Sequence, residues 1–174
     1  MKKVLKALPL VLVFVIVFAV IAVAWRNQEA KMNSIRISSK DEGVGLQIRL
    51  YGDDSQPLSQ SITIDSTAME LKPCVYSNGT FVNQKGTNVT DNAEYVRAIE
   101  IFIQPESSCN LRMTKVQSGD LPVKVIANDI EVTDNTGIAK LNTNGRILTL
   151  YFYIDGDEYT EPGTATIDLT LVGA

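Results

Sequence analysis

The chain has 174 residues, a formal net charge of −4 and no histidine. Without imidazole it lacks the base of Ser-His-Asp and Cys-His enzymes and the usual ligand of zinc proteases. When the three lysines of the first segment are set aside, 13 basic residues oppose 20 acidic ones. This balance argues against nucleic acid as a partner, because phosphate binding needs clustered Lys and Arg. We therefore expect a protein that is no enzyme and needs no cofactor.

Residues 1–24 have the layout of a secretory signal. Three lysines precede an apolar run over residues 7–25. The small residues Ala22 and Ala24 near its end predict cleavage before Trp25. The run is also close to the length of about 20 residues that a membrane-spanning helix needs, so a retained hydrophobic anchor helix is the alternative. In both cases the rest of the chain is predicted to be secreted or displayed at the cell surface.

Residues 25–34 are predicted as an N-terminal donor or linker segment, and residues 35–174 as one domain. Period-two alternation of apolar and polar residues, which is typical of half-buried strands, is strongest over 94–104, 146–155 and 165–171. Weaker candidates lie at 32–38, 44–51, 61–65, 110–116 and 123–133. Turn-forming residues such as Asn144-Gly145 separate them. The pattern predicts an all-β antiparallel sandwich, jelly-roll-like in its order of strands.

The segment 66–93 interrupts this pattern. It is rich in Asn, Thr and Gly, and its apolar residues are scattered without a period. A stretch of this length without regular structure is uncommon in a compact domain. We expect either a surface excursion with short strands or a functional arm.

Asp155, Asp157 and Glu158 form the one metal-like cluster of the sequence. They lie around a glycine, and calcium prefers oxygen ligands on bent backbone. The full twelve-residue calcium loop is missing, so an ordinary acidic turn after a strand is favoured and calcium stays a weak candidate.

Cys74 and Cys109 both lie in the predicted exported part. An even number of cysteines in an oxidising compartment usually forms disulfides, so we expect a bond between these two. Buried free thiols are the alternative.

Several segments resemble the TasA/camelysin-like proteins of Gram-positive bacteria, whose leaders are processed by the SipW class of signal peptidase. The similar segments are 33–38, 42–48, 71–81, 148–157 and 167–169. The resemblance implies a jelly-roll domain, secreted or held at the cell surface. Some family members assemble into biofilm-matrix fibres by donating an N-terminal strand to the next subunit. The chain departs from the family directly after the leader, where Trp25-Arg26-Asn27-Gln28 replaces the usual aromatic-Phe-Thr/Ser-Asp stretch.

The leading hypothesis is a non-enzymatic subunit of a surface or matrix fibre, with itself or a related surface protein as partner and membrane contact only through the leader. An exposed sheet edge accepts the strand of another chain. Met32, Ile35 and Ile37 are the predicted anchors of the donated strand. The alternatives are a membrane-anchored binding module for a carbohydrate or protein ligand, and a pilin-like subunit that retains its hydrophobic helix.

Overall fold

The structure is a computed structural model that describes residues 30–174, with residues 65–69 described by their backbone alone. The described residues form strands joined by turns and loops, so the prediction of an all-β protein is confirmed. The strands are β1 (Ala30–Lys40), β2 (Leu46–Leu50), β3 (Ser61–Leu71), β4 (Val75–Ser77), β5 (Thr80–Val82), β6 (Val96–Pro105), β7 (Cys109–Gly119), β8 (Val123–Ala127), β9 (Ile130–Glu131), β10 (Thr136–Leu141), β11 (Arg146–Ile154) and β12 (Thr164–Gly173).

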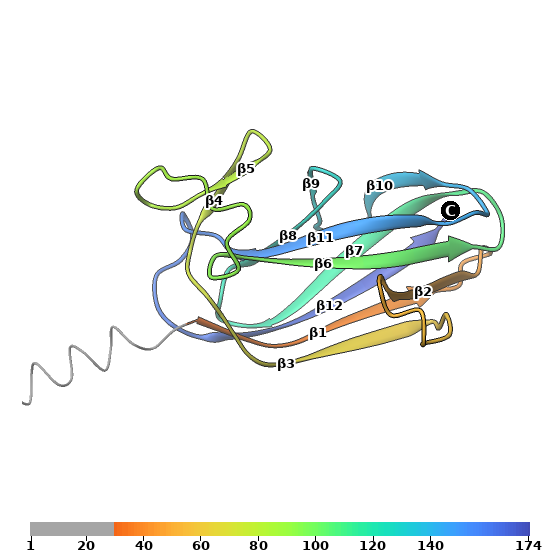
Figure 1. Cartoon of the computed structure of the whole chain (residues 1–174), viewed down its shortest axis with the longest axis horizontal. Coiled ribbons are helices and arrows are strands. Elements are labelled where there is room, and N and C mark those ends of the chain that lie inside the picture. The colour runs from red at the N-terminus through yellow and green to blue at the C-terminus, as the bar shows by residue number, and fades with distance from the viewer. Residues whose placement is uncertain (1–29) are drawn as a thin grey trace, which may run out of the picture.

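Two five-stranded sheets make up most of the molecule (Figure 1). The first sheet has the order β10-β7-β12-β1-β3, and the second has the order β2-β6-β11-β8-β9. Neighbouring strands run antiparallel except β1 and β12, which are parallel. The short hairpin β4-β5 forms a separate two-stranded sheet near one end of the sandwich.

The core lies between the two five-stranded sheets, which pack face to face as a β-sandwich. Alternate residues of β6 and β11, such as Ile101, Ile103, Leu150 and Phe152, are fully buried. Ile167, Leu169 and Leu171 close the core from β12. Because successive side chains of a strand point to opposite faces, the alternation of the sequence selected these residues correctly.

Two stretches differ from the expected element boundaries. The predicted strand 123–133 is divided by Asn128 and Asp129, whose φ angles of 51° and 61° form the tight turn between β8 and β9. Two consecutive left-handed residues are what a two-residue hairpin requires. β1 begins at Ala30, which is five residues before the expected domain boundary at Ile35.

Candidate functional site

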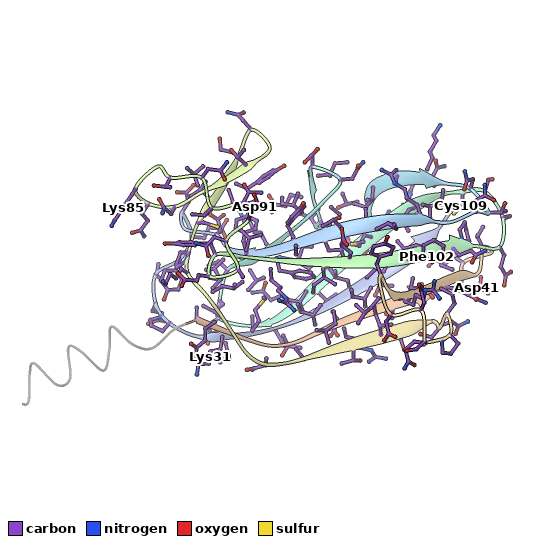
Figure 2. The ribbon with its side chains drawn as sticks, viewed as in Figure 1. Lys31, Asp41, Lys85, Asp91, Phe102 and Cys109 are labelled. Carbon is purple, nitrogen blue, oxygen red and sulfur yellow. The ribbon has the colours of Figure 1, made fainter. Side chains whose placement is uncertain are left out.

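β1 lies in the interior of its sheet, with β12 on one side and β3 on the other. Figure 2 labels Lys31 and Asp41 near its two ends. Met32, Ile35 and Ile37 are completely buried, whereas Arg36 is exposed. The three residues predicted as anchors in a neighbouring subunit therefore complete the core of their own sandwich.

A β-bulge makes the spacing of these anchors possible. Met32 and Ile35 are an odd number of residues apart, so a regular strand would place them on opposite faces. The register shifts between Met32 and Ser34 against both β12 and β3. The extra residue of a bulge returns the following side chains to the first face, so Met32, Ile35 and Ile37 all point into the core.

The slot that β1 fills is lined by β3, which follows it in the same half of the chain, and by β12 at the other end of the chain. Ile35 stands opposite Ile167 of β12 and Ile64 of β3, and Ile37 stands opposite Leu169. At the start of the strand, Lys31 forms a 2.9 Å ion pair with Glu70. Neighbouring strands lie about 4.8 Å apart, so removing β1 would leave β12 and β3 separated by about 10 Å without a hydrogen-bonding partner between them.

Residues 41–45 form a short connection from β1 to β2 in the other sheet. The Gly43 amide donates a 3.0 Å hydrogen bond to Asp41 Oδ1, and Gly43 has a left-handed φ of 108°. A Cβ atom on Gly45 would lie 2.7 Å from the carboxylate of Glu106. The turn is therefore compact and held by specific local contacts.

The acidic turn is an ion-pair cluster around Lys124. Its ammonium group contacts Asp155 Oδ2 and lies 3.0 Å from Glu158 Oε1 and 4.0 Å from Glu131 Oε1. Hydrogen bonding to Asp155, followed by Glu158, raises the pKa of Lys124. Asp155 Oδ1 also accepts a 3.0 Å hydrogen bond from the Asp157 amide. The sequence did not reveal Lys124 because β8 lies beside β11 only in the folded sheet.

The weak calcium candidate therefore has an ammonium group among its carboxylates. The ammonium of Lys124 occupies the position between Asp155 and Glu158 in which a cation would bind. Asp157 contributes its backbone amide to Asp155 instead of a second carboxylate. Within residues 30–174 there is no group of three or more His, Cys, Asp and Glu side chains arranged to hold a metal ion.

The part of the predicted excursion 66–93 that follows β3 packs on the outer face of the second sheet. Phe81 of β5 is buried against Tyr153 and Tyr151 of β11 and Tyr76 of β4, with ring centroids 5.0, 5.7 and 4.8 Å away. The Tyr76 hydroxyl donates a 3.1 Å hydrogen bond to Asp129. β3 continues to Leu71, and β4-β5 provides the short strands that the sequence allowed. The aromatic residues thus form a second small core that attaches the excursion to the sheet.

The predicted disulfide is wrong for this fold, because the two thiols are free and lie at opposite ends of the sandwich. The Cys74 amide donates to Ile154 O near the start of β12, whereas Cys109 Sγ lies against Gly173 at its end. Figure 2 shows Cys109 at the end opposite to β4 of Figure 1. β12 alone spans about 30 Å, and a disulfide needs Cα atoms within about 7 Å.

The predicted cleavage residues Ala22, Ala24 and Trp25 lie outside the described residues, as does the predicted anchor helix. Among residues 30–174, no helix has the length and apolar character to cross a membrane. Comparison with known protein families, curated proteins and solved structures finds no match to this chain.

Proposed function

We propose that this protein is a non-enzymatic structural subunit of an extracellular surface or matrix fibre, and that copies assemble by exchange of β1. The observation that carries the proposal is the position of β1: the first described strand of the sandwich fills a slot between β3 and the last strand, β12. The secretory layout of residues 1–24 and the resemblance to the TasA/camelysin-like proteins support it from the sequence. We also propose that the strands of the sandwich follow a jelly-roll order.

The contacts of β1 explain why a second copy can provide the same strand. β1 meets β12 and β3 through backbone hydrogen bonds and through Met32, Ile35 and Ile37, and each of these contacts forms equally well with β1 of a neighbour. Burial of each such side chain contributes about 1.5–3 kcal/mol. Because the closed and exchanged forms share these contacts, the balance between them depends mainly on the connection at residues 41–45 and on concentration.

The short connection favours exchange. Residues 41–45 must carry the chain from one sheet to the other in the closed form, and short hinge loops promote swapping of the element that they hold. In the exchanged form the connection extends, and β1 reaches the slot of the next copy. When each copy donates its strand to one neighbour and accepts the strand of another, the contact is head-to-tail, and without ring closure it continues into a filament.

A disulfide trap tests the exchange directly. Arg36 of β1 and Thr63 of β3 are exposed neighbours in register, so Arg36→Cys with Thr63→Cys should form a disulfide. The background is Cys74→Ala with Cys109→Ser. In assembled material the bond should join neighbouring copies and give a ladder of covalent multimers on a non-reducing gel.

The matched controls are the two single cysteine variants, which form at most dimers. A Gly-Ser insertion after Gly43 lengthens the connection and should shift the trapped bond from between copies to within one copy. If assembled fibres yield only internally bonded monomers, exchange of β1 is ruled out. If the exported protein forms no assembly at all, the fibre function itself is ruled out.

A further inference from the structure

β6 is paired along only half of one edge. β11 covers it from Val96 to Ile103, while β2 pairs only with the later part, from Ile101 to Pro105. After Leu50 the chain turns away from β6, and its last hydrogen bond to this strand runs from the Tyr51 amide to Glu100 O. No strand within residues 30–174 continues β2 along the first half of β6.

The direction of the backbone groups on this open edge follows from two hydrogen bonds. Glu100 O points away from β11, because it accepts from Tyr51, and the Val96 amide also points away, because it donates to Asn92 O at 3.0 Å. Groups of alternate residues in a strand point the same way. Ala98 lies between these two and is exposed, so its N–H and C=O face the open side.

A recess of about 630 Å³ lies at this place. Leu50, Ile64 and Ile99 line it on the core side, and Asp91, Glu100 and Tyr151 line it on the outer side. Figure 2 labels Asp91, which lines this recess, and Phe102, where β2 already pairs with β6. The recess therefore continues the path of β2 over a length of about five residues.

β2 shows which side chains fit beside β6. Its Ile48 is fully buried toward the core. Its Arg49 points outward, 5.5 Å from the centroid of the Phe102 ring, and forms a 2.7 Å ion pair with Asp54. In the recess the core side carries the apolar residues Leu50, Ile64 and Ile99 beside Arg97, and the outer side carries the exposed carboxylates of Asp91 and Glu100. Arg97 is exposed, and as the alternate residue to Ile99 it points to the same side of β6 as Ile99 does. Its positive charge therefore lies on the side of the strand away from the two carboxylates.

We propose that this recess binds an extended segment of a partner protein in which apolar residues alternate with basic ones. The segment pairs with the N–H and C=O of Ala98, places its apolar side chains beside Leu50, Ile64 and Ile99, and directs its basic side chains to Asp91 and Glu100. The site shares Ile64 of β3 with the slot of β1 but lies along β6 and does not depend on strand exchange, so it provides a lateral attachment point on each subunit.

The test uses the ¹⁵N-labelled full chain in detergent micelles and a blocked nine-residue peptide of alternating valine and arginine. Titration should shift the amide resonances of Ala98 and its neighbours on β6. A peptide of alternating valine and glutamate should bind about fivefold more weakly or worse, because cross-strand charge pairs change sign. A peptide with proline in place of each valine keeps the positive charge but cannot pair as a strand, and it should leave Ala98 unshifted.

Ala98→Pro removes the amide donor from the open edge, where proline is tolerated because the N–H makes no bond within the sheet. Binding should fall at least about fivefold, the effect of one lost hydrogen bond, while Ala98→Ser keeps it. Should Ala98→Pro unfold the sandwich, Glu100→Lys provides the second test, because it should reverse the preference toward the glutamate peptide.

Three results would overturn the proposal. The first is equal binding of the valine–arginine peptide and of its variant with proline in place of valine. Binding would then reflect only general charge attraction. The second is a shift of Ala98 that depends only on protein concentration, which would make a second copy the occupant. The third is a shift of Tyr51 and Tyr151 with a neutral oligosaccharide but none with the peptides, which would make the recess a sugar site.

Discussion

At some positions of this sandwich the backbone leaves no room for a larger side chain, and Gly119 is one of them. Gly119 ends β7 with a φ of 99°, a left-handed conformation that L side chains rarely adopt. A Cβ atom at this position would lie 2.1 Å from Thr164 O. The backbone of β12 cannot move away, because it is held on both sides by β7 and β1.

We therefore expect Gly119→Ala to lower the free energy of unfolding by more than about 2 kcal/mol, since it combines backbone strain with a clash. Urea unfolding measures the change. Gly137→Ala in β10 is the matched control, because a Cβ atom there meets no atom within 4 Å and φ is not left-handed, so this variant should unfold within about 0.5 kcal/mol of the wild type. Equal losses in the two variants would contradict the clash.

The thiol of Cys74 gives a pH dependence with a defined sign. Burial, with a smaller contribution from Asp155, raises its pKa from 9.0 to about 12. The unfolded chain therefore loses this proton at lower pH than the folded chain. Stability should be fully present below pH 9 and should fall as the pH rises toward 12, by up to about 1.4 kcal/mol per pH unit.

The measurement compares urea unfolding between pH 8 and pH 11 for the wild type, Cys74→Ala and the control Cys109→Ser. Cys74→Ala should show a shallower decline, because its unfolded state has one proton fewer to lose. The same slope in all three proteins would show that Cys74 does not contribute.

At the scale of elements, the excursion depends on one aromatic ring. Phe81 contacts three tyrosines. Truncation of such a buried ring leaves a cavity that lowers the free energy of unfolding of its cooperative unit by about 3–5 kcal/mol. The main core has separate residues. Phe81→Ala should therefore release the segment 72–95 and leave the sandwich folded.

Limited trypsin digestion should cut Phe81→Ala rapidly after Lys85, while the melting temperature of the sheets changes little. Thr87→Ala, an exposed change in the same segment, should remain as resistant as the wild type. If Phe81→Ala unfolds the entire chain in one transition, the excursion is part of the main cooperative unit.

We expect the fold to require β1, whichever copy supplies it. Ile35→Asp with Ile37→Asp would place two carboxylates in a core where both positions are fully buried, and each uncompensated buried charge costs several kcal/mol. Because domains are stable by only about 5–15 kcal/mol, we expect this variant to lose its sheet signal in circular dichroism.

The control places two carboxylates on the exposed face of the same strand, as Asn33→Asp with Arg36→Asp. It should remain folded. A folded, soluble double Ile→Asp variant would show that the sandwich forms without β1, and that this strand is dispensable within one copy.

At the scale of the whole molecule, we expect the predicted leader to determine whether the chain is secreted or stays in the membrane. The small residues Ala22 and Ala24 fit the pockets of a signal peptidase, so we expect the exported protein to begin at Trp25. Mass spectrometry of protein from native cells measures this end. Ala24→Leu should block cleavage and keep the chain in the membrane fraction, whereas Ala24→Gly should be cut normally. An uncut wild-type chain in the membrane would favour the anchored alternative.

The sequence by itself determined the all-β class and most of the core, because a strand fixes the direction of each side chain through a period of two. Ile101, Leu150 and Ile167 follow from this rule alone. The same local rules located the turn at Asn144-Gly145, where Gly145 has a φ of 77°.

Only the tertiary structure decided which strands are neighbours, because pairing joins residues that are far apart in the chain. It placed β1 between β12 and β3, separated Cys74 from Cys109, and brought Lys124 to Asp155 and Glu158. It also left half of one edge of β6 unpaired, because β2 turns away after Leu50. Alternation is a local property and contains no information on the partner of a strand, so neither the slot of β1 nor the recess beside Ala98 could be derived from it.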